Sequence, residues 1–307
     1  MKTKIWIVCW WDEIFDKNVG ARTFRNWPDN DYFELDEENY EYLIVLGAFN
    51  GKSSKYFRDS DKTIGFMLEP EWSTNWQRDL DRYCKYVVAQ DKNMYPHASN
   101  IIEHPMFMFT ESTDHHELYM GGEFPKTRRM SIISSNYGHK FNYVKRHALF
   151  NALLQTDLDI DFYGRRWELD DPRYKGAPYN KSEAILDYQY SIAIENSSYK
   201  NYLTEKFFDL AVCNTVPIYY GCPNVSEIYP QESFVEIDFS GPIEQTVEQI
   251  KDIYHNDSYE YRLPHLLEAK KLYYTKYNIF NFLENMIKEG RLWKSAWSIK
   301  AVVWETF

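Results

Sequence analysis

Residues 190–221 constrain the fold of this chain more than any other segment of its sequence. The apolar run Tyr190–Ile194 has the length and composition of a buried strand. After a polar loop, Thr204 stands where the N-cap of a short helix is expected, and Asn214 is a suitable stop. A second apolar run, Val216–Tyr220, predicts another strand. This strand–loop–helix–strand order is typical of open α/β sheets, which bind ligands at the carboxyl ends of their strands.

The first turn of this predicted helix carries Glu205 and Lys206. The unpaired N–H groups at a helix N-terminus favour a phosphate, and Lys206 adds a full positive charge. Taken alone, the pattern also fits an ordinary βαβ crossover with a charged first turn. The order of residues on either side of it, described below, favours a phosphate site.

The same alternation of strands and helices extends over most of the chain and predicts doubly wound parallel sheets. A helical pattern covers 143–154, and apolar residues recur at helical spacing between Ile243 and Tyr254, before a Tyr-rich helical stretch that reaches about Lys288. The further predicted strands are Ile5–Trp10, Tyr42–Leu46, Ile64–Leu68, Tyr86–Ala89, Met130–Ile133, Ile160–Tyr163 and Phe234–Ile237.

Composition limits the class of protein. The 307 residues include 46 acidic and 35 basic side chains, a formal net charge of -11, which argues against nucleic-acid binding because that needs a basic face. No stretch is apolar for long enough to span a bilayer. The four cysteines are scattered without metal-ligand spacing, which favours free thiols in a reduced compartment, and we therefore expect a cytoplasmic protein.

Three motifs in this central segment share an order with one known family. They are Ile194-Glu195-Asn196-Ser197, then Tyr202-Leu-Thr-Glu-Lys206, then Thr215-Val-Pro-Ile-Tyr-Tyr-Gly221 followed by Pro223. The segment closely resembles the donor-site motif of glycosyltransferase family 10, the α-1,3/4-fucosyltransferases. Animal members carry an N-terminal membrane anchor, and the absence of one here resembles the soluble bacterial and viral members. Tyr220 departs from the pattern, because most members pass from one residue directly to the glycine.

The resemblance implies the GT-B architecture, with two Rossmann-like, doubly wound domains that face a cleft. We place an acceptor-binding domain at 1–125, because the polar, Gly-rich stretch 111–126 is typical of a boundary. The donor domain is expected at 126–288. A C-terminal helical tail, 289–307, carries Trp and Lys residues, and we expect it to pack on the first domain rather than to make a weak peripheral membrane contact.

The resemblance also implies a reaction. The expected enzyme is an inverting glycosyltransferase that moves L-fucose from GDP-β-L-fucose, its co-substrate, to a hydroxyl of a glycan acceptor in glycan biosynthesis or protein glycosylation. It needs no metal cofactor, although a divalent ion is allowed as a stimulant. The alternatives are a same-fold enzyme that uses another GDP-sugar or a UDP-sugar such as UDP-xylose, and a catalytically inactive glycan-binding protein.

Candidate residues follow from the chemistry and from the motif. A departing diphosphate needs cations, and Lys206 with Arg165 or Arg166, directly after a strand, can supply them. The resemblance assigns Glu205 to the nucleotide ribose and Asn196 and Tyr202 to the same pocket.

Four more residues are assigned by the resemblance. Ser135, Asn136 and Arg146 match a Ser-Asn turn and a helix Arg that open the family's donor domain. Deprotonation of the acceptor hydroxyl requires a base. Glu69, just after a predicted strand of the first domain, matches a glutamate of bacterial members, and Glu71 is the alternate.

Overall fold

The computed structural model describes residues 2–9, 31–48, 53–68, 80–94, 100–105, 124–137 and 141–288. These residues divide into two compact units, each built around its own parallel sheet. The first unit comprises the described residues up to His104 together with 280–288, and the second comprises those from Pro105 to Ile279.

The first unit contains a six-stranded sheet in the order β2-β1-β3-β4-β5-β6, and every pairing is parallel. Its central strands are buried along their whole length, as expected when both faces of a parallel sheet are covered. Helix α8 (Ile279–Lys288) belongs to this unit from its second residue on, and its Phe282 ring contacts those of Phe66 and His104. The strands are β1 (Thr3–Cys9), β2 (Phe33–Leu35), β3 (Tyr42–Leu46), β4 (Thr63–Phe66), β5 (Tyr86–Ala89) and β6 (Ile101–Glu103), and α2 spans Leu80–Tyr83.

The second unit contains another six-stranded parallel sheet, in the order β12-β11-β10-β7-β8-β9. The chain first builds outward from β7 to β9 and then from β10 to β12 in the opposite direction. This is the Rossmann order, and its switch point lies between β7 and β10. The strands are β7 (Arg128–Ile133), β8 (Ile160–Tyr163), β9 (Tyr174–Gly176), β10 (Tyr188–Ile194), β11 (Val216–Tyr220) and β12 (Val235–Glu236).

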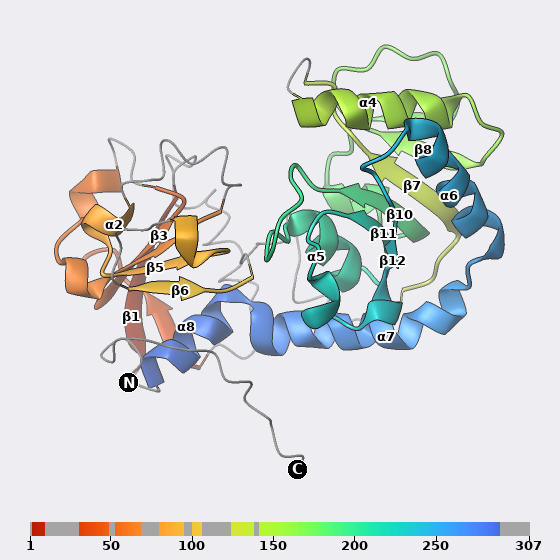
Figure 1. Cartoon of the computed structure of the whole chain (residues 1–307). Coiled ribbons are helices and arrows are strands. Elements are labelled where there is room, and N and C mark those ends of the chain that lie inside the picture. The colour runs from red at the N-terminus through yellow and green to blue at the C-terminus, as the bar shows by residue number, and fades with distance from the viewer. Residues whose placement is uncertain are drawn as a thin grey trace. The chain divides into compact units, whose positions relative to one another are not determined.

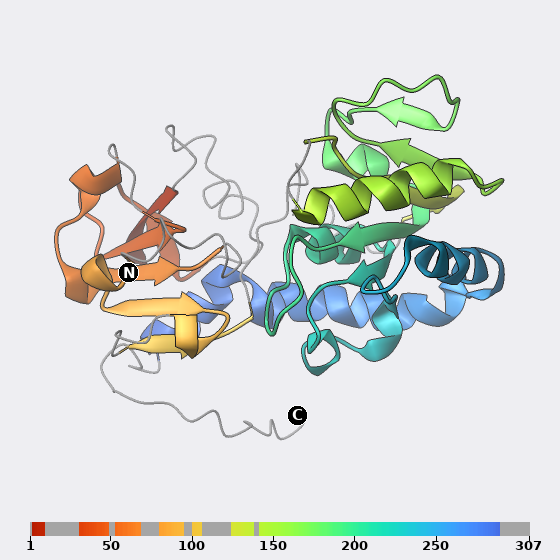
Figure 2. The same ribbon diagram turned by 45° about the horizontal axis from the view of Figure 1, so that its top comes forward.

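Helices cover both faces of the second sheet (Figures 1 and 2). Helix α4 (Phe141–Leu154) packs with α6 (Ile243–Asn256) on one face. Helix α5 (Glu205–Val212) packs with α7 (Tyr259–Leu272) on the other, and α7 continues into a π-helical segment, η9 (Tyr273–Tyr277). The expected doubly wound α/β fold is thus confirmed.

Helix α5 begins and ends where its sequence predicts. The Thr204 hydroxyl accepts a hydrogen bond from the Lys206 N–H, so Thr204 is the N-cap. Asn214 adopts a left-handed φ of 54° just beyond the last turn, and its side-chain oxygen accepts a hydrogen bond from the buried Lys270 ammonium group. Phe207 and Phe208 are buried, which anchors the helix in the core.

Most predicted strands and helices are present, with ends shifted by a few residues. Strands β2, β6 and β9 were not predicted, because each is only three residues long and has no long apolar run. The expected tail at 289–307 lies outside the described residues.

The loops that follow β7 and β8 cross closely at Gly164. A Cβ atom there would lie 2.0 Å from the Ser134 carbonyl oxygen. The backbone of both loops would have to move to make room for a side chain, so glycine is required by contact and not only by conformation.

Gly164→Ala is therefore expected to destabilise the protein by on the order of 3 kcal/mol, the upper part of the usual range for overpacking. Gly176→Ala is the matched control, because Gly176 has a φ of 79° but nothing within 4 Å of an added Cβ. It should cost only about 1 kcal/mol of left-handed strain. Urea unfolding measures both values, and equal losses would contradict the contact argument.

Candidate active site

A cavity of about 640 Å³ opens at the carboxyl ends of β7, β8 and β10, at the switch point of the second sheet. The first turn of α5 forms part of its wall. The cavity brings together six predicted site residues: Ser135, Arg146, Arg165, Asn196, Glu205 and Lys206.

Three other predicted residues do not line this cavity. Tyr202 is buried, with its ring stacked 5.0 Å from that of Tyr199. The Arg166 guanidinium lies 4.8 Å from the centre of the Tyr137 ring, and Asn136 donates its backbone N–H to the Arg165 carbonyl. Their binding roles stay predictions.

The two glutamates predicted as base, Glu69 and its alternate Glu71, lie outside the described residues. Their role also stays a prediction.

Hydrogen bonds join the two loops that carry Ser135 and Arg165. The Ser135 hydroxyl accepts the Arg165 N–H at 3.1 Å, and the Trp167 indole donates to the Ser134 carbonyl at 2.6 Å. His147, on α4, contacts the Ser135 carbonyl at 3.0 Å. These contacts fix Arg165 at the cavity wall, so the geometry favours Arg165 over Arg166 as the cation of this loop.

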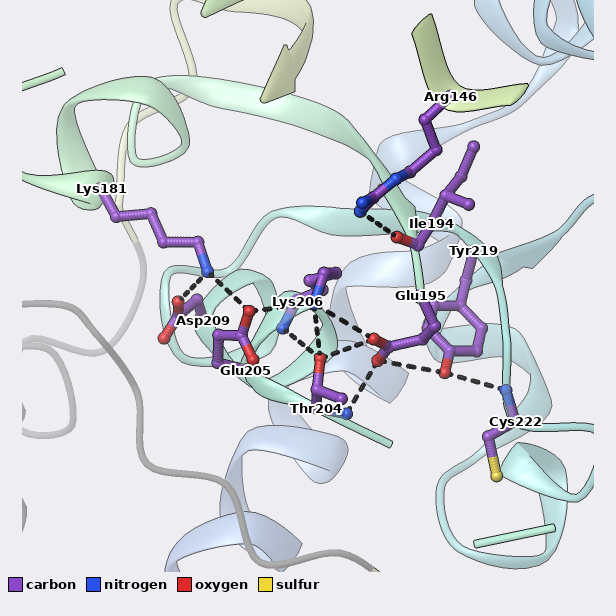
Figure 3. Close-up of polar contacts among 10 residues, drawn as sticks. All are labelled: Arg146, Lys181, Ile194, Glu195, Thr204, Glu205, Lys206, Asp209, Tyr219 and Cys222. Atoms are coloured by element: carbon purple, nitrogen blue, oxygen red, sulfur yellow. Dashed lines mark hydrogen bonds and ion pairs between the residues drawn. The ribbon is translucent and has the colours of Figure 1, made fainter. Parts of the chain in front are cut away.

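Arg146 reaches the cavity from α4. Its Nη1 donates a long 3.4 Å hydrogen bond to the Ile194 carbonyl at the end of β10 (Figure 3). Its guanidinium lies 4.4 Å from the centre of the Tyr143 ring. The buried Nε has no hydrogen-bond partner among the described residues. Arg146 thus lines the cavity while one of its N–H groups has no protein partner among the described residues.

The ammonium group of Lys206 is held at the start of α5 by three oxygens (Figure 3). Its Nζ lies 3.0 Å from Glu205 Oε1, 3.1 Å from Thr204 Oγ1 and 3.4 Å from Glu195 Oε2. The side chain remains 21% exposed, so it is accessible from the cavity that it lines.

Glu195 connects the end of β10 to the start of α5. Its carboxylate is fully buried and accepts hydrogen bonds from the Thr204 N–H at 2.8 Å and the Thr204 hydroxyl at 2.6 Å. A Cβ at Gly221 would lie 2.3 Å from Glu195 Cγ. The glycine that ends the third motif therefore makes room for the glutamate of the first.

A second lysine, Lys181, approaches the same helix from the segment between β9 and β10. Its Nζ lies 2.6 Å from Asp209 Oδ2 and 3.9 Å from Glu205 Oε1. We call Lys181, Glu195, Glu205, Lys206 and Asp209 the acid–lysine cluster.

The charges of this cluster shift the pKa values of its members. Burial alone would raise the pKa of Glu205, but Lys206 and Lys181 lower it from 4.5 to about 2. Burial alone would lower the pKa of Lys206, and Glu205 with Glu195 raises it above 10.5. At neutral pH Glu205 is thus a carboxylate and Lys206 a cation. Burial raises the pKa of Glu195.

Glu195 stands in one of the three motifs but has no predicted role, and Lys181 is not among the residues predicted from the sequence. The sequence contains one local signal for Lys181. Glu205 and Asp209 are four residues apart and share one face of the predicted helix. Two carboxylates buried on that face would require a neighbouring positive charge.

The family model described as "Glycosyltransferase family 10 (fucosyltransferase) C-term" matches residues 124–265, which contain every side chain of the cavity and of the acid–lysine cluster. This segment belongs to glycosyltransferase family 10. The family expectation from the sequence is confirmed.

Two curated relatives whose names include fucosyltransferase each match less than half of the chain. A putative fucosyltransferase-like protein of Arabidopsis thaliana is 34% identical over 130 residues, 41% of this chain and 24% of the relative. An α-(1,3)-fucosyltransferase of Caenorhabditis elegans is 30% identical over 137 residues, 43% of this chain and 35% of the relative. The matched region thus spans only a quarter to a third of these two relatives.

Solved structures share the fold at lower identity. A crystal structure of an α1,3-fucosyltransferase has a TM-score of 0.53 and 18% identity, and covers 88% of this chain and 82% of its own. An α-glucosyltransferase in complex with UDP has a TM-score of 0.57 and 10% identity, and covers 94% and 99%. The fold is GT-B, as expected from the sequence.

Three further findings concern metals, membranes and thiols. The described residues contain no group of three or more His, Cys, Asp or Glu side chains that could hold a metal ion. None of the helices in the described part of the chain has the length and hydrophobicity of a membrane-spanning segment. All four cysteines of the sequence are described, and each is buried and forms no disulfide bond.

The Glu205 carboxylate should make the fold acid-sensitive. Its folded pKa of about 2 lies below its ordinary value of 4.5, so it stabilises the fold above pH 4.5 and this contribution is lost as the pH falls toward 2. Between pH 7 and pH 3.5, the difference in free energy of unfolding between the native protein and Glu205→Gln should narrow by on the order of 1 kcal/mol. Urea unfolding at both pH values measures this difference in free energy. A difference that stays constant would contradict the lowered pKa of Glu205.

Proposed function

We propose that this chain transfers L-fucose from GDP-β-L-fucose to a hydroxyl of a glycan acceptor. The observation that carries the proposal is the placement of Lys206 and Glu205 on the first turn of α5, at the wall of a cavity inside the family 10 segment. The names of the relatives support fucose as the sugar, and a solved neighbour described in complex with GDP-fucose shares the fold.

The donor's diphosphate would sit at the start of α5. Lys206, Arg165 and Arg146 line the cavity and supply positive charge where negative charge builds as GDP leaves. Glu205 is charged and hydrogen-bonded, which suits a carboxylate that accepts bonds from the two ribose hydroxyls. Asn196 lines the same cavity and would complete the nucleotide pocket with Ser135.

The acceptor hydroxyl would be deprotonated by Glu69, with Glu71 as the alternate. Its oxygen would attack the anomeric carbon on the face opposite GDP, so the configuration inverts. The transition state would resemble an oxocarbenium ion, whose departing partner is neutralised by Lys206 and Arg165. We propose that no metal ion is required and that a divalent ion at most stimulates turnover. We also propose a cytoplasmic location, supported by four cysteines that form no disulfide bond.

Thermal unfolding with a panel of nucleotide sugars tests the donor. GDP-fucose at 100 times its Kd should stabilise the protein by about 2.7 kcal/mol. UDP-sugars, including UDP-xylose, should not change the Tm. A shift with UDP-sugars alone would identify a same-fold enzyme with another donor, and binding of GDP-fucose without turnover on any glycan would identify an inactive glycan-binding protein.

Two substitutions test the chemistry. Lys206→Ala should lower kcat/KM for GDP-fucose by on the order of 100- to 1000-fold, because one charged group that stabilises the transition state is lost. Glu69→Ala should lower kcat by a similar factor, and Glu71→Ala is its comparison. Near-native turnover of Glu69→Ala beside a large loss in Glu71→Ala would move the base to Glu71. Near-native turnover of Lys206→Ala would contradict the donor site.

A further inference from the structure

A carboxylate is buried in the apolar part of helix α5. Asp209 is fully buried, and so are the residues beside it, Phe208 and Leu210. Burying a charged carboxylate costs several kcal/mol unless a cation lies next to it. Lys181 supplies that cation, with Nζ 2.6 Å from Asp209 Oδ2 and only 16% of its side chain exposed.

Lys181 also belongs to the cavity. It begins the short 3-10 helix η6 (Lys181–Ala184), and with Pro178, Tyr179 and Asn180 it lines one side of the cavity. The ion pair with Asp209 therefore ties this part of the cavity wall to α5. Since Asp209 follows Glu205 by one helical turn, the anchored Nζ also comes within 3.9 Å of Glu205 Oε1.

Glu205 consequently lies between two lysines (Figure 3). Lys206 binds its Oε1 at 3.0 Å, and Lys181 faces the same oxygen at 3.9 Å. One ion pair alone would leave the carboxylate free to rotate about its side-chain bonds. The second cation restricts that rotation further, and the carboxylate keeps lone pairs that can accept hydrogen bonds in the cavity.

We propose that Lys181, anchored by Asp209, is a positioning residue that orients the Glu205 carboxylate toward the ribose hydroxyls of the donor nucleotide. This inference rests on the proposed function, because it assumes that a nucleotide occupies the cavity. It assigns Lys181 no contact with the phosphates, since its Nζ is directed at the two carboxylates of α5.

The test compares the affinity for GDP with that for 2′,3′-dideoxy-GDP, which lacks both ribose hydroxyls. Isothermal titration calorimetry gives both Kd values, and their ratio reports the ribose contact alone. The native protein should prefer GDP on the order of tenfold, as expected for hydrogen bonds to a charged group. In Lys181→Met the ratio should fall toward one, and Lys181→Arg should restore most of it.

Two further variants distinguish a change in the ribose contact from a general loss of folding. Lys181→Met leaves Asp209 buried without its cation, so Lys181→Met/Asp209→Asn removes both charges and should also show a ratio near one. Lys175→Met is the matched control, because Lys175 pairs with Asp161 at 3.2 Å and does not line the cavity. Its ratio should equal that of the native protein.

The outcomes separate this inference from the proposed function. If GDP does not bind the native protein, both are overturned. If GDP binds and Lys181→Met keeps the native ratio, only the role of Lys181 is overturned. The role of Lys181 is also overturned if Lys181→Met weakens the binding of GDP, dideoxy-GDP and inorganic pyrophosphate by equal factors. Lys181 would then be a phosphate ligand.

Discussion

The site depends on a buried carboxylate, that of Glu195 at the end of β10. Its desolvation is unfavourable, and the Thr204 N–H, the Thr204 hydroxyl and the Lys206 ammonium group offset that cost. Because Thr204 is the N-cap of α5, the same contacts set where the helix begins and which way its first turn faces. The position of Lys206 at the cavity is thus a consequence of the contacts between the Glu195 carboxylate and the groups that begin α5.

Much of the fold was predictable because strands of a parallel sheet are buried on both faces and appear as continuous apolar runs. Tyr42–Leu46 and Val216–Tyr220 match their strands residue for residue. The ends of α5 were predictable for another reason. Thr204 offers a hydroxyl to free N–H groups and Asn214 tolerates a left-handed backbone, and both effects act within a few residues.

Other features depend on contacts between distant segments, which a single sequence does not encode locally. The edge strand Tyr174–Gly176 forms only because β8 lies beside it. Arg165 and Arg166 are equivalent in sequence, yet Arg166 takes a left-handed φ of 65° and turns to Tyr137, while Arg165 lines the cavity. Lys181 meets Asp209 only in the folded chain, so the acidic pair on α5 indicates that a cation is needed but not which lysine supplies it.

The four buried thiols have a practical consequence. Cys9 and Cys84 belong to the first unit and Cys213 and Cys222 to the second, and none is more than 4% exposed. Burial raises the pKa of Cys84 and that of Cys222, the latter to about 11, so little reactive thiolate exists at neutral pH. Alkylation of these sulfurs requires local or global opening. Mass spectrometry after timed exposure to iodoacetamide would therefore report the opening of each half of the molecule separately, without any engineered label.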